Sequence, residues 1–177
     1  ITKTYDFIFV GTFDERKNPF LVLKAFKDLI KNKNNFILCL IGSGPLEKDM
    51  IRYIKKNKLE KNIKFFSNLR RKEVIKKISQ SKILLSSSLF ETFGVVLIEA
   101  YSQGVPVLIT DSIGVRNVFK KGCGRLIKSF SINEYSKNML EMIDNLKKYK
   151  KKKIIKIFNK NYHPKLIIKR HIELYKK

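Results

Sequence analysis

The chain has 177 residues, a formal net charge of +24 and 44% hydrophobic residues, a composition ordinary for a globular protein apart from its charge. We expect one domain with a substantial core. No apolar run approaches the length of a membrane-spanning helix, no signal peptide is visible, and two cysteines and two histidines offer no zinc-ligand spacing.

The positive charge is spread over most of the expected helices, without a basic motif interleaved with aromatic residues. We therefore interpret the lysines first as solvated helix surface. Attraction to an anionic membrane surface or an anionic acceptor ranks second. Sequence-specific nucleic-acid binding ranks a distant third, although so basic a composition is typical of such domains.

Apolar runs alternate with segments of helical periodicity along the chain. The expected strands are residues 6–10, 36–41, 63–66, 83–85 and 105–111, with an edge strand within 122–127. The expected helices begin at Pro19 and near Gly94, span 45–56, 72–79 and 132–148, and end the chain after Pro164. A nearly all-lysine segment, 147–153, marks an exposed helix end or junction. The alternation predicts an α/β fold with a Rossmann-like parallel sheet covered by helices on both faces.

Four loops follow the first four expected strands: residues 11–17, 42–45, 67–70 and 91–94. Ligands of open parallel sheets bind beyond the carboxyl ends of the strands, so we expect these loops to form one rim around a single site. The glycines of 42–45 invite comparison with a dinucleotide-binding fingerprint. Pro45 and Glu47 leave no third glycine at the required place, which makes a Rossmann dehydrogenase a weak alternative.

The segment 86–100 is the one around which the chain is organised. A serine-rich loop leads to a helix that opens near Gly94, where free N–H groups and the positive dipole end suit a phosphate. Glu91 precedes this helix end and Glu99 lies on the helix. Carboxylates accept hydrogen bonds from hydroxyl groups, so both suit a sugar. In the plainer alternative, Thr92 caps the helix and the acidic residue only complements its dipole.

This segment, Phe90-Glu91-Thr92-Phe93-Gly94 through Glu99-Ala100, followed by Gly104-Val105-Pro106-Val107, resembles the E-x7-E region of retaining, nucleotide-sugar-dependent glycosyltransferases of family 4. The resemblance implies a two-domain GT-B enzyme, of which residues 1–177 would be the C-terminal, donor-binding domain. It implies that Glu91 contacts hydroxyls of the donor sugar and Glu99 holds the ribose. The backbone amides of Phe93, Gly94 and Val95 would bind the diphosphate and sugar.

The loop after the first strand resembles the family's G-R-L…K-N/G segment, in which an arginine and a lysine clamp the donor diphosphate. Gly11 and Lys17 match the glycine and the lysine, while Thr12 stands where the arginine is expected. The clamp is then one cation short, unless Arg16 reaches in. The resemblance thus assigns all four residues to the donor, with Lys17 in a catalytic role beside Glu91.

Three further segments extend the resemblance. Gly42 and Gly44 match a G-x-G-P-L turn that faces the donor cleft. Asn68 and Leu69 lie in the loop that borders the nucleobase, and asparagine replaces a common glycine while tolerating a left-handed backbone. Residues 113–117 keep one glycine of a Gly-Gly-x-Pro-Glu turn and lose its Pro-Glu pair, so contacts of that turn are not carried over.

The sequence therefore predicts the donor half of a retaining hexosyltransferase that transfers sugar from a nucleoside-diphosphate sugar to a glycan or lipid-linked acceptor. The chain begins at Ile1 rather than Met, and we take it to be an excerpt without its acceptor domain, inactive alone. We expect no metal and no cofactor, because Lys17 and helix amides would carry the diphosphate charge. The expected location is the cytoplasm, with the inner membrane face second. A non-catalytic nucleotide- or polyanion-binding module stays open as the alternative.

Overall fold

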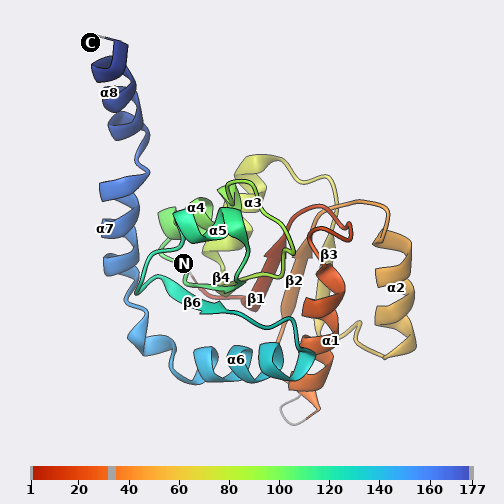
Figure 1. Cartoon of the computed structure of the whole chain (residues 1–177). Coiled ribbons are helices and arrows are strands. Elements are labelled where there is room, and N and C mark those ends of the chain that lie inside the picture. The colour runs from red at the N-terminus through yellow and green to blue at the C-terminus, as the bar shows by residue number, and fades with distance from the viewer. Residues whose placement is uncertain (1, 32–34, 176–177) are drawn as a thin grey trace.

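The structure is a computed structural model that describes residues 2–31 and 35–175. Within these ranges one sheet is formed by β1 (Tyr5–Val10), β2 (Leu38–Ile41), β3 (Ile63–Phe66), β4 (Ser81–Ser86), β5 (Val107–Thr110) and β6 (Gly124–Ile127). All neighbouring strands are parallel, and their order is β3-β2-β1-β4-β5-β6 (Figure 1). The strand order reverses between β1 and β4, so the loops that follow these two strands diverge at a topological switch point, where open α/β sheets bind ligands.

The helices are α1 (Pro19–Ile30), α2 (Glu47–Lys56), α3 (Arg71–Ser79), α4 (Val95–Ser102), α5 (Ile113–Val118), α6 (Ile132–Asp144), α7 (Lys151–Asn161) and α8 (Pro164–Tyr175), with a 3-10 turn η1 (Leu146–Lys148). Alternate strand residues point to opposite faces. Phe7 and Phe9 of β1 therefore pack with buried residues of α1, α2 and α6, whereas Ile8 packs with those of α3, α4, α5 and α7. The expected sheet with helices on both faces is confirmed.

Most expected elements are present, with shifted ends. The second strand begins at Leu38 instead of residue 36, and the strand expected at 105–111 covers only Val107–Thr110. The helix expected at 45–56 starts at Glu47, after a turn. Residues 113–117, expected as a turn, belong to helix α5.

Two expectations at the C-terminal side are wrong. The helix expected at 132–148 ends at Asp144, because Asn145 leaves helical geometry and its side-chain amide donates to the Glu141 carbonyl at 2.9 Å. Helix α7 was not expected, since lysines dominate its sequence, yet it packs against α4 and its Ile154 is fully buried. The lysine-rich segment is, as expected, a junction, between η1 and α7.

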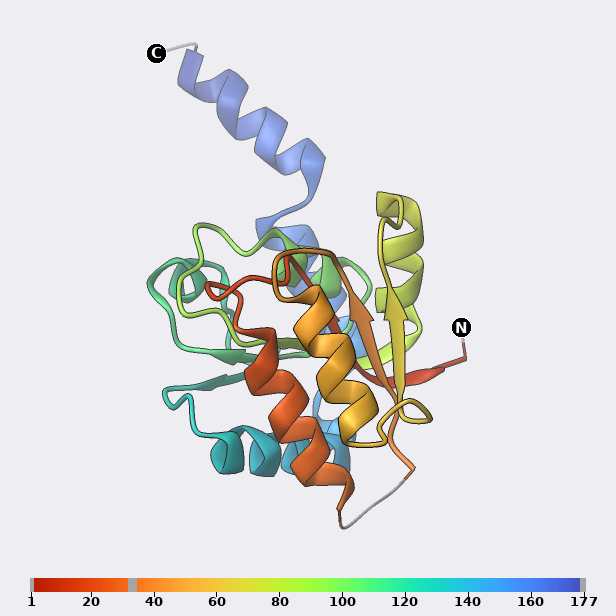
Figure 2. The same cartoon turned by 90° about the vertical axis from the view of Figure 1, so that its right-hand side faces the viewer.

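Helix α8 extends away from the rest of the fold in both views (Figures 1 and 2). It carries exposed Ile168, Ile172 and Tyr175. Among the described helices, none is both long and apolar enough to cross a membrane. Cys39 and Cys123 are buried free thiols, as expected for Cys39. The side chain of His171 lies outside the described residues.

Candidate functional site

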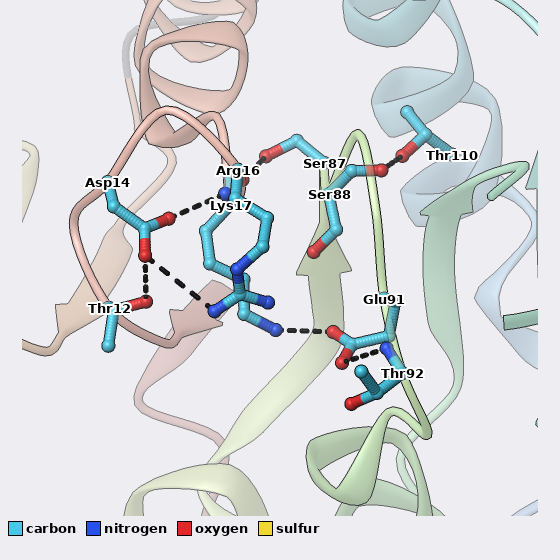
Figure 3. A network of polar contacts seen from close by, with 9 residues as sticks. All are labelled: Thr12, Asp14, Arg16, Lys17, Ser87, Ser88, Glu91, Thr92 and Thr110. Atoms are coloured by element: carbon cyan, nitrogen blue, oxygen red, sulfur yellow. Dashed lines mark hydrogen bonds and ion pairs between the residues drawn. The ribbon is translucent and has the colours of Figure 1, made fainter. Parts of the chain in front are cut away.

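The loops after β1 and β4 meet at the switch point through one ion pair. The ammonium group of Lys17 donates to Oε2 of Glu91, 74 residues further along the chain (Figure 3). Their side chains are only 16% and 7% exposed. The sequence assigned these residues to different parts of a donor, and their direct contact was not predicted.

Glu91 is held as an anion. Oε1 accepts from the Thr92 amide at 3.1 Å, and the Gly94 amide adds a further hydrogen bond. Burial raises the pKa of the Glu91 carboxyl, but the hydrogen bond and charge of Lys17 and these two amides outweigh burial and hold the pKa below its ordinary value. At neutral pH the group therefore accepts hydrogen bonds and does not donate them.

Asp14 organises the loop after β1. Its Oδ1 accepts from the Lys17 amide at 2.8 Å, and its Oδ2 accepts from the Thr12 hydroxyl at 2.8 Å and lies 3.6 Å from Arg16 Nη2. Burial raises the pKa of the Asp14 carboxyl, but these hydrogen bonds and cations outweigh it and hold the pKa low. Figure 3 shows the Lys17 side chain reaching Glu91, while the Arg16 guanidinium is paired with Asp14. Arg16 is thus tethered beside Thr12, the position where the sequence left the clamp a cation short.

The serine-rich loop after β4 is hydrogen-bonded to the loop after β1 and to β5. The Ser87 hydroxyl donates to the carbonyls of Lys17 and Asn18 at 2.9 and 2.8 Å, and the Leu89 amide donates to the Arg16 carbonyl at 2.9 Å. The Ser88 carbonyl accepts from the Thr110 hydroxyl of β5 at 3.0 Å. Sequence reasoning treated these serines only as a loop, although small hydroxyl residues directly after a strand are a signal for such backbone tethering.

Gly94 begins α4 in the left-handed region, with φ 71°, and no side chain caps this helix end. The alternative in which Thr92 caps α4 is therefore wrong. Phe93 and Val95 expose half of their side chains, 54% and 53%. The expected contacts of these residues are backbone contacts, and the amides at the start of α4 lie beside Glu91 in the chain.

Gly114 on α5 packs against the backbone of the loop that carries Glu91. A Cβ at this position would lie 1.6 Å from the Glu91 carbonyl oxygen, so α5 packs directly onto the loop backbone. The sequence kept this glycine from the family's turn without assigning it a role. Its role in the structure is close backbone approach.

The loops after β1, β2 and β3 enclose a cavity of about 270 Å³. Its lining comprises Val10, Gly11, Thr12, Ile41, Gly42, Ser43, Asn68, Leu69 and Val74. Five residues predicted to bind a donor are among them. Asn68 has φ 54°, the left-handed conformation that asparagine tolerates. Together with the Lys17–Glu91 pair, this cavity places the four predicted loops on one rim.

Gly42 and Gly44 pack loops together. A Cβ on Gly42 would lie 1.9 Å from the Gly11 carbonyl oxygen, and one on Gly44 would lie 2.7 Å from that of Phe13. Gly44 is not among the residues that line this cavity, and its close approach to Phe13 supports the loop after β1.

Glu99, the second carboxylate of the motif, lies on α4 and takes no part in the Lys17–Glu91 pair. Its Oε1 accepts from Arg71 Nε of α3 at 3.0 Å. Sequence reasoning did not single out Arg71, because the contact spans 28 residues and two helices. In the described ranges no three His, Cys, Asp or Glu side chains form a group that could hold a metal ion.

Several solved structures share this fold. The chain aligns over its whole length with 36% of a point mutant of TarM from S. aureus, crystallised with fondaparinux, alpha-GlcNAc-glycerol and UDP, at a TM-score of 0.86 and 19% identity. It aligns over 93% of its length with 89% of the C-terminal domain of LpcC, a group 1 family protein from Francisella tularensis, at a TM-score of 0.79 and 17% identity. At these identities the likeness shows the fold, a Rossmann-like sheet that matches GT-B glycosyltransferases.

Sequence relatives carry the comparison further. The chain is 26% identical over 173 residues to YqgM of Bacillus subtilis strain 168, an uncharacterized glycosyltransferase, covering 94% of this chain and 47% of YqgM. The chain therefore spans about half the length of that relative. The family model described as "Glycosyl transferases group 1" matches residues 1–157, which include the whole candidate site. The chain belongs to the group 1 glycosyl transferases.

Proposed function

We propose that this chain is the donor-binding domain of a retaining, family 4 hexosyltransferase that uses a nucleoside-diphosphate sugar. The observation that carries the proposal is the buried Lys17–Glu91 pair at the switch point, beside the start of α4. A cation and free helix amides suit a diphosphate, and an ionised carboxylate suits sugar hydroxyls. Few other ligands carry a diphosphate directly beside sugar hydroxyls.

The cavity beside this pair suits the nucleoside part of the donor. Its volume of about 270 Å³ is just below the range of small-molecule pockets, so it suits part of a nucleotide sugar while the diphosphate extends along the rim. Asn68 and Leu69 of the 67–70 loop would border the base, largely through backbone atoms. Glu99 on α4 would accept hydrogen bonds from the ribose. TarM, which shares the fold, was crystallised with UDP.

In the proposed reaction, the bond between the donor's anomeric carbon and its phosphate oxygen breaks, and an acceptor hydroxyl forms the new bond on the same face. The electron pair stays on the departing diphosphate, whose freed oxygen would take the proton that the acceptor hydroxyl loses. Lys17 and the α4 amides would stabilise that charge in a largely buried setting, where electrostatic stabilisation is strong. Glu91 would hold the sugar by its hydroxyls. This scheme uses no metal and no cofactor, and the nucleotide sugar is a substrate.

The acceptor, a glycan or a lipid-linked glycan, would bind to an N-terminal domain outside this sequence. The coverage of YqgM and the match to a C-terminal domain in LpcC support this division. The chain alone would then bind nucleotide without transferring sugar. A cytoplasmic location, with peripheral association at the inner membrane face as a secondary expectation, follows from the resemblance and from the net charge of +24.

The test is calorimetric titration of the 177-residue chain with UDP, GDP and ADP and with their sugars. We expect saturable one-to-one binding of one of the three diphosphates. Binding of none of them would overturn the proposal, and sugar transfer to an added glycan by this chain alone would overturn the division into domains.

The net charge of +24 favours one other function, a non-catalytic polyanion-binding module. Titration with a DNA duplex of arbitrary sequence at several salt concentrations separates the two. Tight, steeply salt-dependent DNA binding without a preference among nucleotides would support the module.

A further inference from the structure

Arg71 and Glu99 form an ion pair that crosses from one helix to the next. The Arg71 Nε donates to Glu99 Oε1 at 3.0 Å. The two side chains differ in their surroundings, since the arginine is 78% exposed and the carboxylate only 15% exposed. A mostly buried carboxylate is thus held by a cation that reaches in from the surface.

Neither Arg71 nor Glu99 lines the proposed nucleoside cavity, but Arg71 lies next in the chain to residues that do. Arg71 is the first residue of α3 and follows the 67–70 loop, whose Asn68 and Leu69 line the cavity. Val74, one helical turn after Arg71 on the same face of α3, also lines it. Helix α3 packs against α4, which carries Glu99, so the ion pair joins the start of α3, directly after the 67–70 loop, to the helix that bears the carboxylate.

Only one carboxylate oxygen takes part in this pair. Among the residues that the structure describes, no donor is found for Oε2 of Glu99. A carboxylate rotates between several side-chain conformers, and fixing one oxygen restricts the other. An oxygen with free lone pairs, fixed in direction, is suited to accept hydrogen bonds from neighbouring hydroxyl groups.

We propose that Arg71 is a positioning residue for ribose recognition, which holds Oε1 of Glu99 so that Oε2 accepts from the ribose hydroxyls. The inference rests on the proposed function, which assigns Glu99 to the ribose. Arg71 itself contacts neither base nor phosphate in this scheme. Its contribution therefore depends on the presence of the ribose hydroxyls and of Glu99.

The neighbouring arginine provides a matched control. Arg70 is 88% exposed and pairs with Glu73 of its own helix, at 3.2 Å from Nε to Oε2. Arg70→Ala and Arg71→Ala remove the same charge at adjacent positions, but only the second releases Glu99. Any general effect of positive charge on nucleotide affinity should be shared by both variants.

The experiment measures the dissociation constants of the parent, Arg70→Ala, Arg71→Ala and Arg71→Lys for the tightest of UDP, GDP and ADP. Each is also titrated with the 2′,3′-dideoxy form of that nucleotide. We expect Arg71→Ala to weaken binding of the ribonucleotide about three- to fivefold, as an ion pair of this exposure allows, relative to Arg70→Ala. Binding of the dideoxy nucleotide should differ less than twofold between these variants, and Arg71→Lys should recover part of the loss.

A double-mutant cycle with Glu99→Gln completes the test. In that background Arg71→Ala should have no further effect on ribonucleotide binding, because the group that it positions is already altered. Equal losses for ribo and dideoxy nucleotides would overturn the proposal, since Arg71 would then act on the phosphates or base. So would equal affinities of Arg70→Ala and Arg71→Ala. Failure of the parent to bind any of the three nucleotides would instead overturn the proposed function. Thermal unfolding of each variant verifies that the fold is kept.

Discussion

Replacing Lys17 by methionine tests the central ion pair through stability. The substitution keeps an unbranched apolar stem beside Gly11 and removes the charge that faces Glu91. Leaving one member of a fully buried pair without its partner costs about 3–5 kcal/mol. Here the carboxylate keeps the amides of Thr92 and Gly94 and some solvent contact. We therefore expect a loss of about 1.5–3 kcal/mol in the free energy of unfolding at neutral pH.

The loss should depend on pH in a defined direction. In the parent the Glu91 pKa is below its ordinary value, so the pair stabilises the fold above the unfolded-state pKa, about 4.3. This contribution disappears as the pH falls through the lower, folded-state pKa. In Lys17→Met, burial is opposed only by two amides, and protonation of Glu91 relieves the penalty. The difference between parent and variant should thus shrink as the pH falls to about 4 and below.

Urea unfolding followed by circular dichroism measures both quantities. The matched control is Lys82→Met, because Lys82 of β4 pairs at 2.7 Å with Asp6 of β1, the strands that precede the two loops, but is 37% exposed. We expect that control to lose at most about 1 kcal/mol. The double variant Lys17→Met with Glu91→Gln should lose less than the two single losses combined. A Lys17→Met variant as stable as Lys82→Met at every pH would refute the reasoning.

Three further predictions concern the rim. Glu99→Ala should weaken binding of a bare nucleoside diphosphate about ten- to hundredfold, the cost of losing a hydrogen bond to a charged group, while Glu91→Ala should leave it unchanged. Titration of both variants with UDP, GDP and ADP measures this, and equal losses of affinity would contradict the assignments. Thr12→Arg should strengthen binding of a diphosphate more than of a monophosphate at fixed ionic strength, and an unchanged ratio would contradict a clamp short of one cation. Gly114→Ala should lower the melting temperature by several degrees, about 2–4 °C per kcal/mol, since its Cβ would lie 1.6 Å from the Glu91 carbonyl oxygen; an unchanged melting temperature would contradict this.

The sheet could be predicted from the sequence because its central strands are buried on both faces. Such strands read as continuous apolar runs, as in Phe7-Ile8-Phe9 and Leu38-Cys39-Leu40-Ile41. Strand ends were less predictable. An apolar residue in the adjoining loop, such as Phe36, also packs against the core and extends the apolar run beyond the strand. Helix α7 was missed for the opposite reason, since its lysines conceal the periodicity of its few packing residues.

The position of the site could be predicted, but its internal pairing could not. Loops that follow parallel strands share one edge whatever their residues, which is why the rim was expected. The partners of Lys17 and Glu99 are 74 and 28 residues away in sequence, and no local pattern selects Glu91 or Arg71 for them. The need for glycine at position 114 is likewise visible only in the structure, because a Cβ there would lie 1.6 Å from the Glu91 carbonyl oxygen.

Under the proposed function, the pairing explains how a rim that binds an anionic donor can hold acidic residues. The chain has 15 Asp and Glu residues against 39 Lys and Arg, yet Asp14 and Glu91 lie at this rim and Glu99 lies on α4, the helix that begins there. Each unpaired carboxylate would repel a diphosphate, and each unpaired cation would adopt many conformers. Paired in the donor-free chain, the carboxylates fix the cations in place and lose their repulsion. The proposed donor would then meet positive groups that are already oriented, and carboxylate oxygens that hydroxyl groups can approach.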